Sequence, residues 1–435
     1  MKAALTTLGC RLNQADTAAL AGILKEAGYQ IIPWQEVADL YLINTCTVTA
    51  GTDQQSRQAI RQAHRANPSA LIIATGCYAQ VDPGAIASIE GVDLVLGNRE
   101  KLDLKSYLQD LAKGGRPRIA VGDISQGTLF QDRGACEETP RTRPLLKVQE
   151  GCSGECTYCI VPRARGPERS LPPAQVKDKL VSLLARGFKE VVLTGTRLGA
   201  YGHDLAPRAN LSELLSNLLP LPGTWRLRLS SLEPHDISPH LVLALQGSPR
   251  LCRHLHLPLQ SGDDEILALM GRTDRVEGYR SLLQDLAAGL PGIGLGADII
   301  VGFPSETKEH FLRTFRFLEE MPLSYLHVFP FSARPGTPAA TLPHAPSPQE
   351  KKDRARQLRS LGREKSLQFR SGFIGRELEV VVLRKRDRQG RGWLALSDNY
   401  LPILIQDRGE EGIGQLVSIV VEGMDQDLLL GRRKE

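Results

Sequence analysis

Three cysteines in one short run constrain the fold of this chain more than any other feature. Cys152, Cys156 and Cys159 follow the pattern CxxxCxxC, and Tyr158 directly precedes the last of them. Three thiolates this close in sequence can ligate three irons of a four-iron, four-sulfur cluster and leave the fourth iron open for chemistry. Zinc ribbons usually combine two close cysteine pairs, and the sequence has no second pair. We therefore expect a loop that holds an open iron–sulfur cluster.

The composition is that of an ordinary soluble globular protein, with 435 residues, 41% hydrophobic and 24% charged. The formal net charge of +5 is compatible with a nucleic-acid partner but does not require one. The first residues form too short an apolar run for a signal peptide, and no apolar stretch is long enough to span a membrane. We therefore expect a cytoplasmic protein without a membrane partner, in a reducing compartment that favours cysteines as metal ligands over disulfides.

Residues 1–115 alternate between strand and helix patterns, which predicts a doubly wound α/β domain with a mostly parallel sheet. One cysteine follows each of three predicted strands, Lys2–Leu8, Leu40–Thr45 and Ala70–Thr75. These cysteines are Cys10, Cys46 and Cys77. Because the carboxyl ends of parallel strands share one edge of a sheet, we expect the three to meet and hold a second cluster. The alternative is that they are unrelated small buried residues.

Residues 116–140 are rich in Gly, Arg, Pro and Thr, which predicts a linker, and Cys136 within it has no expected role. Residues 141–370 return to the strand–helix alternation. Six such units predict a partial (β/α)6 barrel, in which chemistry takes place at the carboxyl ends of the strands. Cys152 follows the first of these strands, Leu145–Gln149, as that rule requires.

Residues 371–435 contain five short strand patterns, which predict a small barrel similar to the oligonucleotide-binding fold. Its first hairpin is strongly basic, and we consider two interpretations for it: contacts to nucleic-acid phosphates, or a solvated turn. The basic residues are Arg384, Lys385, Arg386, Arg388 and Arg391.

With both cysteine sets in place, the chain resembles the radical S-adenosylmethionine (SAM) methylthiotransferases over essentially its whole length. The matching segments are Thr7–Gln14, Asn44–Thr49, Gly76–Gln80, Gly151–Gly166, Leu193–Thr196, His256–Gly262, Asp298–Pro304 and Ser332–Thr337. The resemblance implies that the cluster on Cys152, Cys156 and Cys159 binds and cleaves SAM to give a radical. It also implies that a second [4Fe-4S] cluster, on the other cysteine set, holds the sulfur that is methylated and inserted. A reducing electron donor and a sulfur donor are then further partners.

The resemblance also implies contacts to SAM or substrate from residues at the strand ends. Thr194–Thr196 match the segment that binds the amino group of SAM, and Arg165 with Arg169 are candidates for neutralising a carboxylate or a phosphate. For His256, the alternative interpretation is a core histidine whose hydrogen bonds are satisfied inside the protein. Cys252 is expected to be buried without a ligand role. The full set implied for SAM is Tyr158, Thr194, Gly195, Thr196, His256, Gln260, Ser261, Asp298 and Gly302.

The C-terminal domain resembles a TRAM domain, which implies tRNA as the substrate. The segments around Cys10 and Cys46 are closer to the branch that acts on N6-threonylcarbamoyladenosine than to the isopentenyladenosine branch. We therefore expect formation of 2-methylthio-N6-threonylcarbamoyladenosine next to the anticodon. The alternatives are N6-isopentenyladenosine in tRNA, an aspartate of a ribosomal protein, or, outside catalysis, an iron–sulfur carrier.

Overall fold

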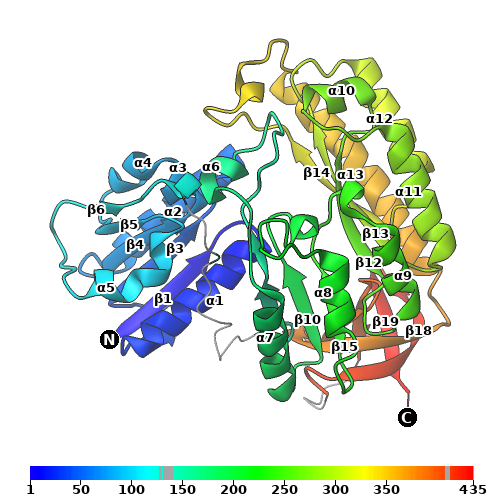
Figure 1. The fold of residues 1–435 in the computed structure, drawn as a ribbon, viewed down its shortest axis with the longest axis horizontal. Helices are drawn as coiled ribbons and strands as arrows, with labels where there is room; N and C mark the ends of the chain where they lie inside the picture. The colour runs from blue at the N-terminus through cyan, green and yellow to red at the C-terminus, as the bar shows by residue number, and fades with distance from the viewer. Residues whose placement is uncertain (127–129, 131–140, 407–411, 435) are drawn as a thin grey trace.

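The computed structural model describes residues 1–126, 130, 141–406 and 412–434. The chain forms three bodies in sequence order, an N-terminal α/β domain, a central half-open barrel and a small C-terminal β-barrel below it (Figure 1). Cys136 and its segment lie outside the described residues. Among the described residues, none of the helices combines the length and apolar character needed to cross a bilayer.

The N-terminal domain is built on a six-stranded sheet in the order β2-β1-β3-β4-β5-β6, with every neighbouring pair parallel. Its central strands are almost entirely buried, which fits their continuous apolar sequences. The strands are β1 (Lys2–Thr7), β2 (Gln30–Ile32), β3 (Leu40–Thr45), β4 (Leu71–Gly76), β5 (Leu94–Leu96) and β6 (Arg118–Ala120). The helices are α1 (Arg11–Glu26), α2 (Ala50–Ala66), α3 (Cys77–Val81), α4 (Pro83–Ala87) and α5 (Leu104–Leu108).

The outermost strand, β6, corrects the predicted linker of residues 116–140. It pairs with β5 through residues 118–120 and so extends the sheet into that segment. Sequence reasoning missed it because it has only three residues and lies at an edge, where Ile119 is 49% exposed. An edge strand that is open to solvent lacks the buried pattern on which the prediction depended.

The central body has six parallel strands, which confirms the predicted partial barrel. They fall into two sheets, β11-β10-β7 and β12-β13-β14, joined by a single bridge between Leu227 and Leu251. The strands are β7 (Leu145–Lys147), β10 (Glu190–Thr194), β11 (Arg226–Leu229), β12 (His254–Gln260), β13 (Gly294–Val301) and β14 (Tyr325–Pro330), and a short antiparallel pair, β8 (Gln149–Glu150) and β9 (Arg169–Ser170), follows β7. The helices are α6 (Val161–Arg165), α7 (Pro173–Ala185), α8 (Leu211–Leu218), α9 (Pro239–Gly247), α10 (Asp264–Leu269), α11 (Val276–Gly289), α12 (Lys308–Glu320) and α13 (Pro348–Ser371).

The C-terminal body is a closed five-stranded barrel in the order β15-β16-β17-β19-β18, as predicted. Two buried arginines of β11 attach it to the central barrel. Arg226 donates to the carbonyl of Leu396 at 2.7 Å, and Arg228 donates to the carbonyls of Ser397 and Asp398 at 2.8 Å. The strands are β15 (Glu377–Arg386), β16 (Trp393–Ser397), β17 (Pro402–Ile405), β18 (Leu416–Asp425) and β19 (Leu428–Arg433).

Candidate active site

The CxxxCxxC loop begins at a glycine that no other residue can replace without a clash. Gly151 has φ +79°, and a Cβ atom there would lie 1.8 Å from the carbonyl oxygen of Pro167. Its N–H donates to Oγ1 of Thr196 at 3.1 Å, and the N–H of Cys152 donates to the carbonyl of Gly166 at 3.0 Å. The turn thereby folds the loop back over the end of the barrel.

Two thiols of this loop, Cys152 and Cys159, resist ionisation on their own. Burial raises the pKa of Cys159 to about 12, and the neighbouring Cys156 and Cys152 add to the rise. Burial also raises the pKa of Cys152. Clustered thiols become stable thiolates when a metal shares their charge, so this donor set fits an iron–sulfur cluster.

The fold brings the other three cysteines together from separate strand ends. Cys10 caps α1, Cys46 follows β3, and Cys77 is the first residue of α3. They lie close enough to interact electrostatically: burial raises the pKa of Cys46 to about 12, and both Cys77 and Cys10 add to it. Gly9, with φ +88°, is required for this approach, because a Cβ atom there would lie 2.6 Å from Sγ of Cys46.

A cavity of about 560 Å³ lies between the two cysteine sets and is lined by members of both. This volume is in the range of small-molecule sites. Six of the lining residues are sequence-predicted site residues: Cys10, Cys46, Tyr158, Cys159, Gln260 and Asp298. The remaining wall is largely apolar, with Val48 and Phe331 among its members. Such walls exclude water from reactive species.

Two cavity residues show features typical of functional sites. Gln260 has φ +66°, a left-handed backbone conformation that a residue with a Cβ atom adopts only when its surroundings impose it. Tyr158 contacts Phe303 edge to face, with ring centroids 6.4 Å apart. Burial holds the pKa of Tyr158 well above its usual range, so it lines the cavity as a neutral aromatic residue.

Asp298 lies between two histidines at the cavity wall. Its Oδ1 is 2.9 Å from Nε2 of His256 and 3.3 Å from Nδ1 of His327. Burial opposes its ionisation, but hydrogen bonds from both histidines outweigh burial and lower its pKa to about 2. Nδ1 of His256 lies 3.0 Å from the hydroxyl of Tyr325. Asp298 is therefore an ionised acceptor, and His256 fixes its orientation.

The remaining predicted SAM residues lie outside the lining of this cavity. Thr196 supports the cysteine loop through Gly151, and a Cβ atom on Gly195 would lie 2.8 Å from Oε1 of Gln149. Thr194 is buried at the end of β10.

Ser261 and Gly302 also have partners inside the protein. The Oγ of Ser261 is buried against Oγ1 of Thr314 at 3.2 Å, and Gly302 donates to the carboxylate of Glu306 at 3.0 Å.

Arg165 belongs to a buried charge network between the N-terminal domain and the barrel, not to the cavity. Its guanidinium pairs with Asp16 at 3.0 Å and also with Glu150. Asp16 in turn accepts from Lys101 at 2.6 Å and from Lys147 at 2.9 Å. A ligand contact of Arg165 stays a prediction; in this structure its guanidinium is bound to acidic groups inside the protein. Sequence reasoning missed this network because its members come from segments far apart in the chain.

Arg169 and Cys252 both have their surroundings inside the protein. Arg169 donates to the carbonyl of Arg165 at 2.7 Å and so adjoins the same network, and its contact to a ligand stays a prediction. Cys252 is buried as predicted, and burial raises its pKa to about 12.

The basic hairpin of the C-terminal barrel is only partly available to a partner. Arg384, Lys385 and Arg388 are exposed. Arg386 is also exposed, but its guanidinium lies 4.5 Å from the ring centroid of Trp393. Arg391 pairs with Asp387 at 2.8 Å and with Asp425 at 2.5 Å, so its charge is already balanced.

Two family models match the chain: "Uncharacterized protein family UPF0004" over residues 2–97, and "Radical SAM superfamily" over residues 146–318. A radical SAM methyltransferase structure, TsrM from Kitasatospora setae, aligns with TM-score 0.56 and 16% identity over 78% of this chain and 77% of that one. At this identity the match shows the fold alone. The radical SAM assignment of the central body rests on the family model over residues 146–318.

Curated relatives match almost the whole chain. The threonylcarbamoyladenosine tRNA methylthiotransferase MtaB of Aquifex aeolicus is 39% identical over 97% of this chain and 100% of its own. MtaB of Bacillus subtilis is 37% identical over 96% and 93%. A tRNA-2-methylthio-N(6)-dimethylallyladenosine synthase of Moorella thermoacetica is 34% identical over 87% and 86%. This chain therefore belongs to the radical SAM methylthiotransferases, in the family of the threonylcarbamoyladenosine tRNA methylthiotransferases.

Proposed function

We propose that this enzyme converts N6-threonylcarbamoyladenosine in tRNA to 2-methylthio-N6-threonylcarbamoyladenosine, next to the anticodon. The observation that carries the proposal is the single cavity that both cysteine sets line. A transfer of sulfur to carbon needs the sulfur source, the radical source and the substrate within reach of one another, and one shared cavity provides this proximity. The near full-length similarity to MtaB of two bacteria supports the same substrate.

The radical SAM family implies one [4Fe-4S] cluster and SAM, and Cys152, Cys156 and Cys159 would hold that cluster. When bound, the cluster and SAM supply a carbon-centred radical able to break a strong C–H bond. We infer that Cys10, Cys46 and Cys77 hold the second cluster, because the three thiols lie close together and two of them, Cys10 and Cys46, line the cavity. A sulfur donor and a reducing electron donor are needed in addition.

The chain's own residues bind and orient SAM and the substrate, and they keep water out of the cavity. Tyr158 and the apolar wall keep water from the reacting groups. Asp298, ionised and held by His256, is an acceptor for a hydroxyl of SAM or of the substrate ribose. Gln260 offers an amide to the same space. Thr194–Thr196, Ser261 and Gly302 act on this site through the strand ends that they hold in place.

The basic hairpin of the C-terminal barrel gives the enzyme a first contact to tRNA. We assign this role to Arg384, Lys385 and Arg388, which are exposed, and a smaller one to Arg386 and Arg391, which have partners inside the domain. Exposed cations on such barrels follow nucleic-acid backbones. A tRNA substrate also agrees with the cytoplasmic location expected from the sequence.

The isopentenyladenosine branch is the second candidate, favoured by the 34% identity to the Moorella thermoacetica synthase. Mass spectrometry of nucleosides separates the two. Reconstituted enzyme, SAM and a reductant are incubated without oxygen, either with tRNA that carries threonylcarbamoyladenosine or with tRNA that carries isopentenyladenosine. Product on the first alone supports the proposal, and product on the second alone overturns the substrate but keeps the chemistry. 5′-Deoxyadenosine without product on either tRNA points to a protein substrate.

A further inference from the structure

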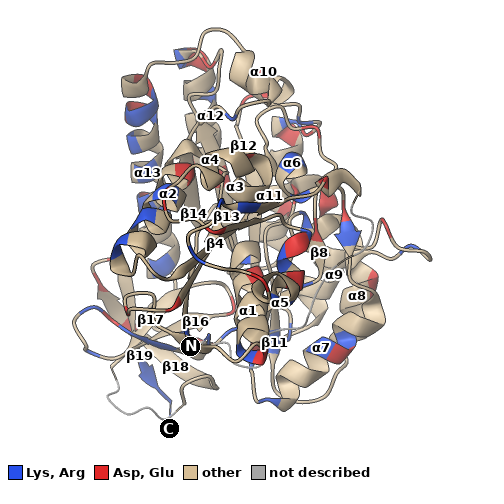
Figure 2. Ribbon diagram, turned by 90° about the vertical axis from the view of Figure 1, so that its left-hand side faces the viewer, with Lys and Arg blue, Asp and Glu red and all other residues tan. Residues whose placement is uncertain are grey.

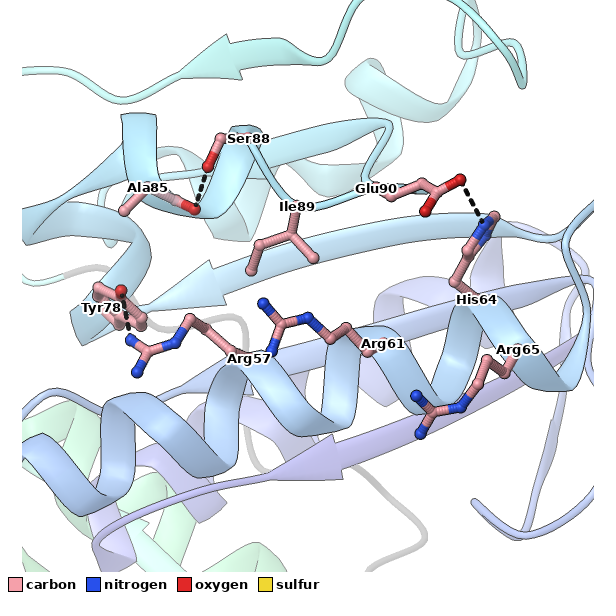
Figure 3. Close-up of a pocket in the computed structure, with 9 residues that line it drawn as sticks. All are labelled: Arg57, Arg61, His64, Arg65, Tyr78, Ala85, Ser88, Ile89 and Glu90. Carbon is pink, nitrogen blue, oxygen red and sulfur yellow. Dashed lines mark hydrogen bonds and ion pairs between the residues drawn. The ribbon is translucent and has the colours of Figure 1, made fainter.

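A groove of about 690 Å³ runs along helix α2 of the N-terminal domain, far in sequence from the basic hairpin. Three arginines line it, Arg57, Arg61 and Arg65, and they follow one another at intervals of four residues. Residues four apart lie on the same face of a helix, so the three form one stripe. Figure 3 shows the stripe along α2, with the short segment from Ala85 to Glu90 forming the opposite wall. We refer to these three residues as the α2 arginine stripe.

Acidic partners are nearly absent from the stripe. Several arginines elsewhere in the described chain pair with acids, as Arg280 does with Glu320 at 2.7 Å. Arg61 and Arg65 are exposed, and neither has a hydrogen bond or ion pair within the described part of the chain. The acidic residue of α2, Asp53, is buried against Arg334.

The groove has one carboxylate at its edge. Glu90 is 90% exposed and lies 3.8 Å from Nε2 of His64, so the groove sets one carboxylate against three arginines. Ile89 and Ala85 form the floor opposite the arginines. The groove therefore carries a net positive charge, with the arginines on one wall and Ala85, Ile89 and Glu90 on the other. A polyanion is the ligand that such a surface fits.

The stripe begins beside the proposed reaction site. Thr49 and Thr52, at the start of α2, line the cavity between the cysteine sets. Arg57 follows after about one and a half turns, and it donates to the hydroxyl of Tyr78 at 2.9 Å. Tyr78 directly follows Cys77, one of the cysteines of the second set. The stripe thus leads from the cavity outward over the domain surface. Figure 2, with Lys and Arg in blue, shows basic positions on this helix.

We infer that the α2 arginine stripe binds the phosphate backbone of tRNA where the strand leaves the cavity. This inference rests on the proposed function, since it takes tRNA as the substrate. From Arg57 to Arg65 the helix rises about 12 Å. One nucleic-acid strand carries a phosphate for about every 3.4 Å of its axis, so the stripe spans about three phosphates. It is a second contact surface, on a different domain from the basic hairpin.

The test measures tRNA binding by the full-length reconstituted enzyme at several salt concentrations, from about 50 to 200 mM. The probe is tRNA that carries threonylcarbamoyladenosine. The test variant combines Arg61→Gln and Arg65→Gln, and a second variant combines Arg61→Lys and Arg65→Lys. Arg57 stays unchanged because it contacts Tyr78. The control variant combines Lys105→Gln and Lys177→Gln, which removes two exposed charges from other helices.

We expect the Gln variant to bind at least about fivefold more weakly, and the slope of log affinity against log salt to fall by about 1.4 to 1.8. The Lys variant keeps most of the slope, the control keeps all of it, and SAM cleavage without tRNA is unchanged in every variant. If the Gln variant binds with the wild-type slope while the wild type still methylthiolates tRNA, the inference alone is wrong. A wild type that binds and modifies no tRNA overturns the proposed function, and the inference with it.

Discussion

The two cysteine sets reach the same cavity in opposite ways. One set lies within the eight residues from Cys152 to Cys159, behind a single strand, whereas the other is spread over three strand ends from Cys10 to Cys77. The compact set depends on one local turn at Gly151. The distributed set depends on the sheet register, in which Thr7 pairs with Asn44 and Thr45 pairs with Gly76. The compact set therefore stays together because its cysteines are close in sequence. The distributed set stays together only while the N-terminal domain is folded.

The electrostatic surroundings differ in the same sense. Arg165 and Lys101 are fully buried beside the distributed set and oppose the burial that raises the pKa of Cys77. Near the compact set, the cation that opposes the rise in the pKa of Cys152 is Arg197, which is partly exposed. Buried cations interact with thiolates far more strongly than solvent-screened ones. The distributed set is thus tied to a charge network that also joins two domains.

The largest expected effect comes from removing one ligand of each set. Cys156→Ala abolishes SAM cleavage, because the compact set no longer holds its cluster. Cys46→Ala leaves cleavage intact but stops methylthiolation of tRNA. Release of 5′-deoxyadenosine and formation of the methylthio nucleoside are measured on the same samples. A Cys46 variant that modifies tRNA at the wild-type rate would show that the distributed set has no part in the reaction.

Arg165→Met tests the buried network beside the distributed set. The change leaves the carboxylates of Asp16 and Glu150 short of a buried partner, which costs about 3–5 kcal/mol of folding free energy. We also expect a loss of iron from the distributed set before the compact one. Denaturant unfolding and iron content are measured, with Arg280→Met as the control for a solvent-exposed pair, worth at most about 1 kcal/mol. Equal losses in the two variants contradict the assigned role.

Acid should loosen this network through Glu150. Burial opposes its ionisation, but Lys147 and Arg165 outweigh burial and lower its pKa to about 2. A carboxyl group whose pKa is lowered by folding stabilises the protein above its unfolded pKa, and this stabilisation is lost as pH falls toward the folded pKa. Unfolding of the apoprotein should therefore become easier between about pH 4.5 and pH 2. Glu150→Gln should flatten this part of the profile, and a variant with the wild-type pH dependence excludes Glu150 as its source.

The smallest effect is expected at the basic hairpin, which contacts neither cysteine set. Changing Arg384, Lys385 and Arg388 to Ala weakens tRNA binding and lowers the salt slope by about 0.7–0.9 for each phosphate that the hairpin no longer neutralises. Arg391→Ala changes the slope less, because two carboxylates already balance its charge. Iron content and SAM cleavage serve as controls and stay at wild-type values. Unchanged binding in the triple variant returns the hairpin to the solvated-turn interpretation.

The sequence predicts these two regions unequally. Spacing alone identifies Cys152, Cys156 and Cys159, because their geometry is local. Cys10, Cys46 and Cys77 needed one further step, the rule that parallel strands end at one edge.

The cavity and the charge network could not be predicted from the sequence. Asp16 and Arg165 are 149 positions apart, and no periodicity marks such a pair. The same holds for Ser261, whose motif indicated a ligand contact while its hydroxyl is buried against α12. Motifs report which residues matter, whereas their partners are fixed by packing across domains.

The arginines of β11 affect how the C-terminal barrel is positioned relative to the central barrel. They donate hydrogen bonds to main-chain carbonyls of the C-terminal barrel. Main-chain atoms are the same whatever side chains the barrel carries. Substitutions of side chains on the outer surface of that barrel can change its RNA preference without altering its orientation relative to the central barrel. If the basic hairpin binds RNA as proposed, these contacts would hold it at a constant distance from the barrel strand ends, and that distance would help to determine which nucleotide reaches the cavity.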